Sequence, residues 1–300
     1  MELSRKESEH ASNKDRNLDV VQTRDWLFLI HFWDPGQVAS VQVLAVATLG
    51  AAYPYRDVSR NAWKDILSVY FTPTSWQGSS CHSVSLRPNR GRPRGSPDSP
   101  DLVVTVHRNM QRQPGPRPPG TVERDVIWVY LIPPCEDTPG KWAAVLNLAV
   151  TRLAAAHPSR MVYLVLACGL KWLPFVWNPR NPAPRPLEIL EQPGPNGVCR
   201  SYATDIRIQA IPSAALAGQK HLVTRPDGRT FVRTSDAYSL DFWTTNRYNG
   251  MLNEPDMVLL EDYLYMSKNG ESVVEVPVND RNSNTGVGAG IDRNLVRLSA

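Results

Sequence analysis

The sequence of 300 residues is poor in cysteine and lacks any long uninterrupted apolar run. Its four cysteines form no CxxC pair, and no pair of histidines completes a zinc pattern, so we expect reduced and inert thiols. The charged N-terminus lacks the apolar core of a secretory signal. The longest apolar stretch is interrupted at Asp34–Gln37 and falls short of the ~20 residues that a membrane span needs. These absences predict an intracellular protein, nuclear or cytoplasmic, that is not secreted and contacts no membrane.

Common nucleotide and hydrolase signatures are also missing, because the sequence contains no P-loop, no GxGxxG and no GxSxG. The net charge of +4 excludes a histone-like polycation but allows a local basic patch. Proline is abundant, at 26 of 300 residues, and predicts long irregular connections between elements. Nine Trp, ten Tyr and six Phe supply large apolar side chains for a packed core and argue against a disordered chain.

Apolar periodicity predicts an α/β to α+β fold. The clearest element is a helix over 140–157, with an apolar stripe from Trp142 to Leu153, a capping Thr138 and Pro139 in the first turn. The order of elements over 58–180 is helix, three strands, helix, two strands. The predicted organisation is a disordered N-terminus (1–22), an apolar segment packed on the core (23–57), the core (58–180), a β-rich C-terminal extension with a hairpin and a helix (181–278) and a flexible tail (279–300).

The segments that flank the core have patterns of their own. Residues 26–33 are apolar on both sides and predict a buried strand or a short helix. Residues 202–211 alternate like one strand, and 221–234 have the composition of a hairpin around a Pro-Asp-Gly turn. Residues 254–268 have the spacing of an amphipathic helix.

Three stretches carry a resemblance to a known superfamily. Pro100-Asp101 opens the second core strand, "PPCEDTPGKW" follows the third, and "HPSRMVYLVLACGLKWLPFVWNP" supplies a helix end, a strand and a Trp-rich hairpin. Over about 120 residues this order resembles the PD-(D/E)XK nuclease-like superfamily, in particular its mostly fungal members that carry E-x-K before a Pro turn. The resemblance implies a restriction-endonuclease-like core.

In that superfamily an Asp and the Glu of E-x-K bind a divalent metal, and the Lys positions the attacking water. Counting back from Pro133, the Glu position falls on Tyr130 and the Lys position on Ile132, so Asp101 is left alone. The resemblance therefore implies a degenerate site at Asp101, Tyr130 and Ile132, with weak metal binding at Asp101 at most. We expect no cofactor, or Mg²⁺ if a displaced carboxylate restores activity. The carboxylates close enough in sequence to do so are Glu123, Asp125, Glu136 and Asp137.

Arginine is concentrated on both sides of the strand that begins at Asp101. "RGRP" (90–93) resembles the AT-hook, whose arginines enter the narrow minor groove of A·T-rich DNA. The alternatives are a loop that contacts phosphates without sequence preference and a merely solvated loop. The candidate nucleic-acid-binding residues are Arg90, Arg92, Arg94, Arg108 and Arg112. His107 and His157 stand isolated in the sequence, and each is expected to be a surface residue or a locally hydrogen-bonded one.

Three functions follow from these patterns. The first is a catalytically degenerate nuclease-like protein that contacts duplex DNA or other nucleic acid through its Arg-rich loops. The second is an active, metal-dependent nuclease with displaced carboxylates. The third is a protein-interaction module without a nucleic-acid role, whose partner the sequence does not identify.

Overall fold

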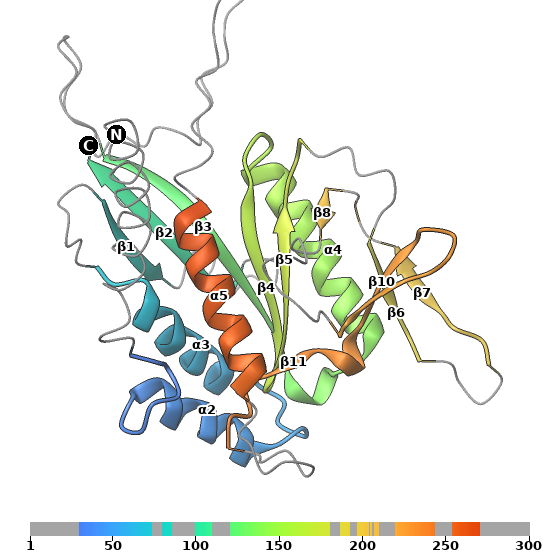
Figure 1. Cartoon of the computed structure of the whole chain (residues 1–300), viewed down its shortest axis with the longest axis horizontal. Coiled ribbons are helices and arrows are strands. Elements are labelled where there is room, and N and C mark those ends of the chain that lie inside the picture. Colours follow the sequence, from blue (N-terminus) through green and yellow to red (C-terminus); the bar gives the residue numbers. More distant parts are fainter. Residues whose placement is uncertain are drawn as a thin grey trace, which may run out of the picture.

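The computed structural model describes residues 30–73, 80–85, 100–109, 121–180, 187–192, 197–203, 205, 207–209, 220–243 and 254–270. These residues form a mixed α/β fold with two sheets (Figure 1), which confirms the expected class. The α-helices described are α2 (Val38–Leu49), α3 (Asp57–Tyr70), α4 (Pro139–Ala156) and α5 (Glu254–Gly270), and short 3-10 turns cover Pro134–Glu136 and Thr234–Asp236.

Strands from distant parts of the chain make up the main sheet, in the order β1-β2-β3-β4-β5-β11, with β8 also paired to β5. All neighbours are antiparallel except β3 and β4, which run parallel. A parallel pair needs a crossover connection, and α4 provides it. The bounds of these strands are β1 (Ser80–Ser85), β2 (Leu102–Asn109), β3 (Thr121–Ile132), β4 (Val162–Cys168), β5 (Lys171–Trp177), β8 (Ile208–Gln209) and β11 (Tyr238–Ser239).

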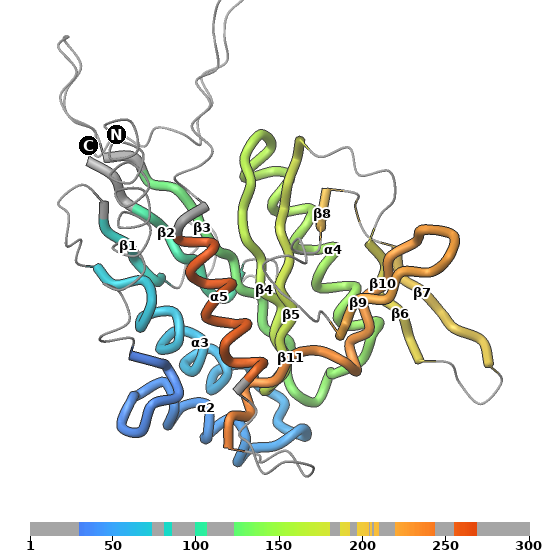
Figure 2. Tube along the Cα trace, viewed as in Figure 1, coloured from blue at the N-terminus to red at the C-terminus, as the bar shows by residue number. Residues whose placement is uncertain are grey.

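A smaller sheet of four strands has the order β7-β6-β10-β9. After β5 the chain alternates between the two sheets (Figure 2): β6 and β7 belong to the small sheet, β8 pairs with β5, β9 and β10 belong to the small sheet, and β11 pairs with β5. The C-terminal part of the chain therefore contributes to the main sheet as well as to its own. The bounds are β6 (Glu188–Leu190), β7 (Ser201–Ala203), β9 (Leu222–Thr224) and β10 (Thr230–Arg233).

The main sheet is covered on both faces, and each face has its own apolar core (Figure 1). On one face α2, α3 and α5 pack around Trp63 and Trp172. On the other face α4 and the small sheet pack around Trp142 and Trp177. Because side chains alternate along a strand, the odd residues of β3 from 127 to 131 face α3 and its even residues from 128 to 132 face α4.

Two polar side chains of α5, Tyr263 and Glu261, bind this helix to the elements around it. The Tyr263 hydroxyl lies within hydrogen-bonding distance of two backbone carbonyls, Leu164 O at 3.1 Å and Phe175 O at 3.2 Å. It thereby links α5 to β4 and β5. At the same helix the buried Glu261 accepts hydrogen bonds from the Tyr70 hydroxyl and from His31 Nδ1, the latter at 2.9 Å. Glu261 thus joins α5 to α3 and to the segment that precedes α2.

Most elements lie where the periodicity predicts them, including the hairpin of β9 and β10 and the helix α5. Residues 202–211 do not form the single strand predicted for them, because β7 ends at Ala203, and β8, which joins the other sheet, begins at Ile208. Residues 30–37 form turns rather than a strand or helix, and the rest of the predicted 26–33 element lies outside the described residues. The terminal predictions for 1–22 and 279–300 also lie outside them.

The buried His221 makes the stability of the fold dependent on pH. Its ring packs edge-on against Tyr238 at 4.8 Å, and burial, with the neighbouring Lys220, lowers the pKa of His221 to about 4. In the unfolded chain its pKa is ~6.5, so the unfolded state takes up the proton first as the pH falls. The free energy of unfolding should therefore decrease by roughly 2–3 kcal/mol between pH 6.5 and 4 on account of this residue.

Urea unfolding of the wild type and of His221→Phe, which keeps an aromatic ring but cannot titrate, measures this contribution. We expect the stability of the variant to fall less steeply over the same pH interval. Parallel curves would show that the His221 proton equilibrium does not contribute.

Candidate functional site

The edge of the main sheet where β3 and β4 end is the natural position for a site. Ligands of α/β sheets bind beyond the carboxyl ends of parallel strands. Because β2 is antiparallel to β3, its first residues lie at this same edge, and the Asp101 N–H donates to Val129 O at 2.9 Å. The strands expected over 101–106 and 125–132 therefore pair, and Asp101 lies beside the last residues of β3.

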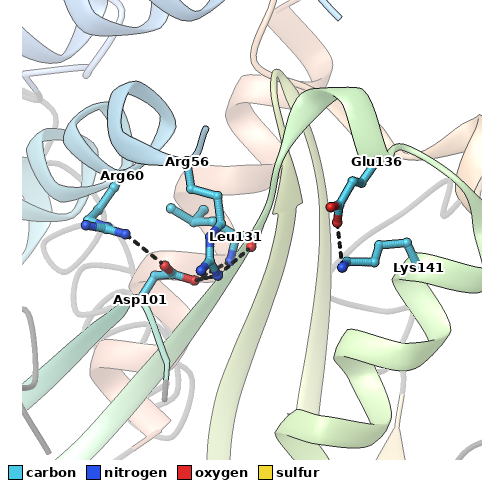
Figure 3. Close-up of polar contacts among 6 residues, drawn as sticks. All are labelled: Arg56, Arg60, Asp101, Leu131, Glu136 and Lys141. Carbon is cyan, nitrogen blue, oxygen red and sulfur yellow. Dashed lines mark hydrogen bonds and ion pairs between the residues drawn. The ribbon is translucent and has the colours of Figure 1, made fainter. Parts of the chain in front are cut away.

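Asp101 is the centre of a buried ionic cluster with Arg56 and Arg60 (Figure 3). Arg56 Nη1 lies 3.3 Å from Asp101 Oδ2, and Arg60 Nη2 lies 3.4 Å from Oδ1. The Leu131 N–H donates to Oδ2 at 2.8 Å, and Arg56 Nη1 also contacts Leu131 O at 3.3 Å. The Asp101 side chain is only 4% exposed, whereas the two arginine side chains are 33% and 35% exposed.

The sequence of α3 explains why both guanidinium groups reach one carboxylate. Arg56 is the N-cap residue and Arg60 follows four residues later, so the two side chains share one face of the helix. Cations at a helix N-terminus are unfavourable because they oppose the helix dipole. The Asp101 charge offsets this cost. Burial raises the pKa of the Asp101 carboxyl, while Arg56, the Leu131 N–H and Arg60 act in the opposite direction.

Tyr130 and Ile132, at the expected Glu and Lys positions, do not face this cluster. Both are buried in the core on the α4 side, whereas the Asp101 carboxylate turns toward α3. If the Glu and Lys positions are instead counted one residue earlier, they fall on Val129 and Leu131. These residues do face α3, as Asp101 does, but they are buried aliphatic residues of the core on that side. No one-residue change of register therefore supplies the carboxylate or the lysine of an E-x-K motif.

Two further carboxylates at this edge are occupied by lysines. Glu136 Oε2 lies 2.5 Å from Lys141 Nζ in the first turn of α4 (Figure 3). Asp137 binds Lys171 Nζ at 2.6 Å and accepts a hydrogen bond from Trp142 Nε1 at 2.8 Å. Both side chains belong to the turn between β3 and α4, and their partners fix that turn to the helix and to β5.

The remaining candidates lie near the opposite end of β3. Asp125 is buried and accepts hydrogen bonds from Trp128 Nε1 at 3.0 Å and from His157 Nε2 at 3.1 Å. His157, which has no other histidine or cysteine near it in the sequence, thus joins the end of α4 to β3 through this hydrogen bond. Six residues of strand separate Asp125 from Leu131, which corresponds to ~20 Å. Neither Asp125 nor the exposed Glu123, which precedes it, can share a metal ion with Asp101.

The residues at the edge do not fit a magnesium ion. Mg²⁺ takes carboxylate oxygens in an octahedral shell, usually with several waters. Both oxygens of Asp101 already have positively charged or N–H partners. Within the described part of the chain, no three His, Cys, Asp or Glu side chains gather closely enough to hold a metal.

The Arg-rich segments attach to opposite edges of the sheet. The segment that contains Arg90, Arg92 and Arg94 lies outside the described residues, but its neighbours Ser85 and Pro100 lie at the Asp101 edge. Arg108 pairs through its backbone with Val122 at the other end of β2, and Arg112 lies outside the described residues. The described neighbours of the two groups, Ser85 and Pro100 for the first and Arg108 for the second, thus lie at opposite ends of β2.

Arg56 and Arg60 are the site residues that sequence patterns missed. Two arginines four residues apart give a faint signal, because such pairs are common on solvated helix faces. What distinguishes them is their contact with a carboxylate 41 to 45 residues later in the chain, which a pattern of local spacing does not encode.

If Asp101 is structural, its removal should destabilise the fold more than the removal of an exposed partner at the same edge. In Asp101→Ala two guanidinium groups and the Leu131 N–H lose their acceptor, which should cost roughly 2–4 kcal/mol. Glu136→Ala breaks a pair whose side chains are 42% and 40% exposed, and it should cost less than about 1 kcal/mol. Urea unfolding of both variants tests this difference, and two equally small losses would contradict the structural role of Asp101.

The edge therefore combines the carboxylates of Asp101, Glu136 and Asp137 with four cations, which are Arg56 and Arg60 of α3, Lys141 in the first turn of α4 and Lys171 at the start of β5. This arrangement can hold the ends of the elements together, and each of these three carboxylates is occupied by a cation instead of being free for a metal. Among the described residues no helix is long and apolar enough to cross a lipid bilayer. No protein-family model, no curated protein and no solved structure matches the chain.

Proposed function

We propose that the chain is a nuclease-like protein that binds nucleic acid without cutting it. The order α3, β1, β2, β3, α4, β4, with three antiparallel strands and then a parallel crossover, supports a restriction-endonuclease-like core. On this proposal the edge beyond β3 and β4 corresponds to the former catalytic centre. A nuclear or cytoplasmic location goes with such a function.

The observation that carries the proposal is the state of Asp101. A catalytic carboxylate must keep oxygens free for a metal, whereas Asp101 accepts hydrogen bonds from two arginines and one backbone N–H. The two positive charges that a metal would bring are supplied here by guanidinium groups. Since a guanidinium cannot lower the pKa of a bound water as a metal does, the edge retains charge but has no means of activating a nucleophile.

Positive charge at this edge supports the nucleic-acid part of the proposal. Arg56, Arg60, Lys141 and Lys171 are each about a third or more exposed, and the described carboxylates beside them are Asp101, Glu136, Asp137 and, in the first turn of α3, Asp57. Ser85 and Pro100, which flank residues 86–99, lie at this edge, and the sequence between them contains four arginines and one aspartate. Phosphates of a nucleic acid are the ligands that such a surface fits.

The purified protein should show no Mg²⁺- or Mn²⁺-dependent cleavage of DNA or RNA, because the three described carboxylates at the edge, Asp101, Glu136 and Asp137, are each paired with an arginine or a lysine. Incubation of labelled duplex and single-stranded substrates with either metal measures this. Asp101→Asn, which keeps the size of the side chain, is the control for a contaminating nuclease. Metal-dependent cleavage that is lost in Asp101→Asn would contradict the proposal and favour an active enzyme.

Binding to duplex DNA should be weak and steeply dependent on salt, since each phosphate that is neutralised releases counterions. Replacing Arg90, Arg92 and Arg94 together by Ala should flatten the slope of log K against log salt by up to about three units. The matched control replaces Arg180, Arg200 and Arg225, three exposed arginines away from the Asp101 edge, and it should leave the slope near the wild-type value.

Titrations on A·T-rich and G·C-rich duplexes at several salt concentrations supply these slopes. A preference for A·T tracts would identify the 90–93 segment as a minor-groove hook, and equal binding would identify a contact with phosphates alone. An absence of binding at low salt, or equal slopes for all three proteins, would remove nucleic acid from the function and leave a protein-interaction module.

A further inference from the structure

One side of the molecule carries an apolar helix face that nothing in the described structure covers. Large apolar side chains are more than 40% exposed at eight described positions, and six of these lie within residues 30–55. On α2 they are Val38, Val41, Leu44 and Leu49, and the flanking positions are Ile30 and Tyr55. The opposite side of α2 packs on α3 through Ala39, Val43 and Val46. The segment expected to be buried is therefore buried on one face only.

The composition of α2 makes this exposure unusual for a surface helix. A surface helix normally pairs one apolar stripe with an outer face of charged and polar residues. The neighbouring helix α3 follows this rule, with Asn61, Lys64 and Ser68 exposed. Helix α2 has no charged residue among its 12 positions. A contiguous exposed apolar patch of this kind marks an interaction surface.

We propose that the exposed face of α2 binds the same face of a second copy of this chain. A partner with a charged docking surface would gain no ion pair from α2 and would have to desolvate its charges. The face therefore fits a partner surface that is equally apolar and uncharged. Among the described residues the other exposed large apolar side chains, Val198 and Val258, stand alone, so α2 itself is the one described surface that matches.

A two-fold axis gives this pairing a simple geometry. In a symmetric dimer each contact occurs twice, so that residue i of one copy meets residue j of the other and the reverse. With the two α2 helices antiparallel and the axis between positions 41 and 44, Val41 of each copy lies against Leu44 of the other. Val38 and the C-terminal end of α2 then extend the contact on both sides. No like charges meet in this arrangement, because α2 carries none.

The size of the face predicts a weak dimer. Twelve helical residues span ~18 Å, and a stripe of that length with its flanking side chains covers only a few hundred Å². Stable complexes bury about 800 Å² on each partner. The dissociation constant of the dimer should therefore be micromolar or higher. This proposal does not depend on the nucleic-acid function proposed above.

The full chain should be examined by sedimentation equilibrium between about 10 μM and about 1 mM, a range chosen for a micromolar dissociation constant. We expect the average mass of the wild type to rise toward that of a dimer with concentration. Val41→Glu and Leu44→Glu place a charge in the contact and should remain monomeric over the same range. Val198→Glu changes an exposed valine elsewhere, of which 75% is accessible, and it should associate like the wild type.

Hydrogen exchange locates the contact independently of these variants. Amides of residues 38–49 should exchange more slowly at high than at low protein concentration, and those of α3 should not change. Because Leu44 is exposed, Leu44→Glu should unfold at the same denaturant midpoint as the wild type. A loss of association in this variant would then not be due to a loss of folding. A wild type that stays monomeric throughout, or a Leu44→Glu variant that still associates, would overturn the proposal. Binding of a monomeric wild type to neutral lipid vesicles would assign the face to a lipid surface instead.

Discussion

The contact between Asp101 and its two arginines is the interaction on which the candidate site depends. It joins the start of β2, the end of β3 and the first turn of α3 through one carboxylate. An unpaired carboxylate in this position would pay a large desolvation cost, and two arginines at a helix N-terminus would oppose the helix dipole. Each unfavourable feature offsets the other, and the same pairing occupies the oxygens that a metal would need.

The parts of the fold that the sequence predicted well are those with strong local periodicity. Helix α4 begins at Pro139 after the capping Thr138, which accepts a hydrogen bond from the Lys141 N–H, and its apolar stripe is buried as expected. β4 is apolar throughout because both of its faces are covered, and a turn at Gly169 with φ of +56° returns the chain as β5. These features need no knowledge of distant residues.

The features that sequence reasoning missed all depend on distant contacts. Residues 202–211 alternate like one strand but divide between two sheets, since β7 pairs with β6 and β8 pairs with β5. His157 was expected to be a surface or hydrogen-bonded residue, but its partner, Asp125 at 3.1 Å, lies 32 residues earlier in the chain and could not be named from the sequence. The pairing of Asp101 with two arginines depends on the packing of α3 against the sheet. Which face of α2 stays exposed likewise depends on how α2 packs on α3.

The most direct test of a metal-free Asp101 is a crystal soaked in Mn²⁺ and measured at a wavelength where manganese scatters anomalously. A carboxylate held by Arg56, Arg60 and the Leu131 N–H predicts no anomalous peak within coordination distance of Asp101, with both arginines still in contact with it. A peak bound to an Asp101 oxygen, with the arginines turned away, would contradict the structural role of this cluster and restore a metal centre to the edge of the sheet.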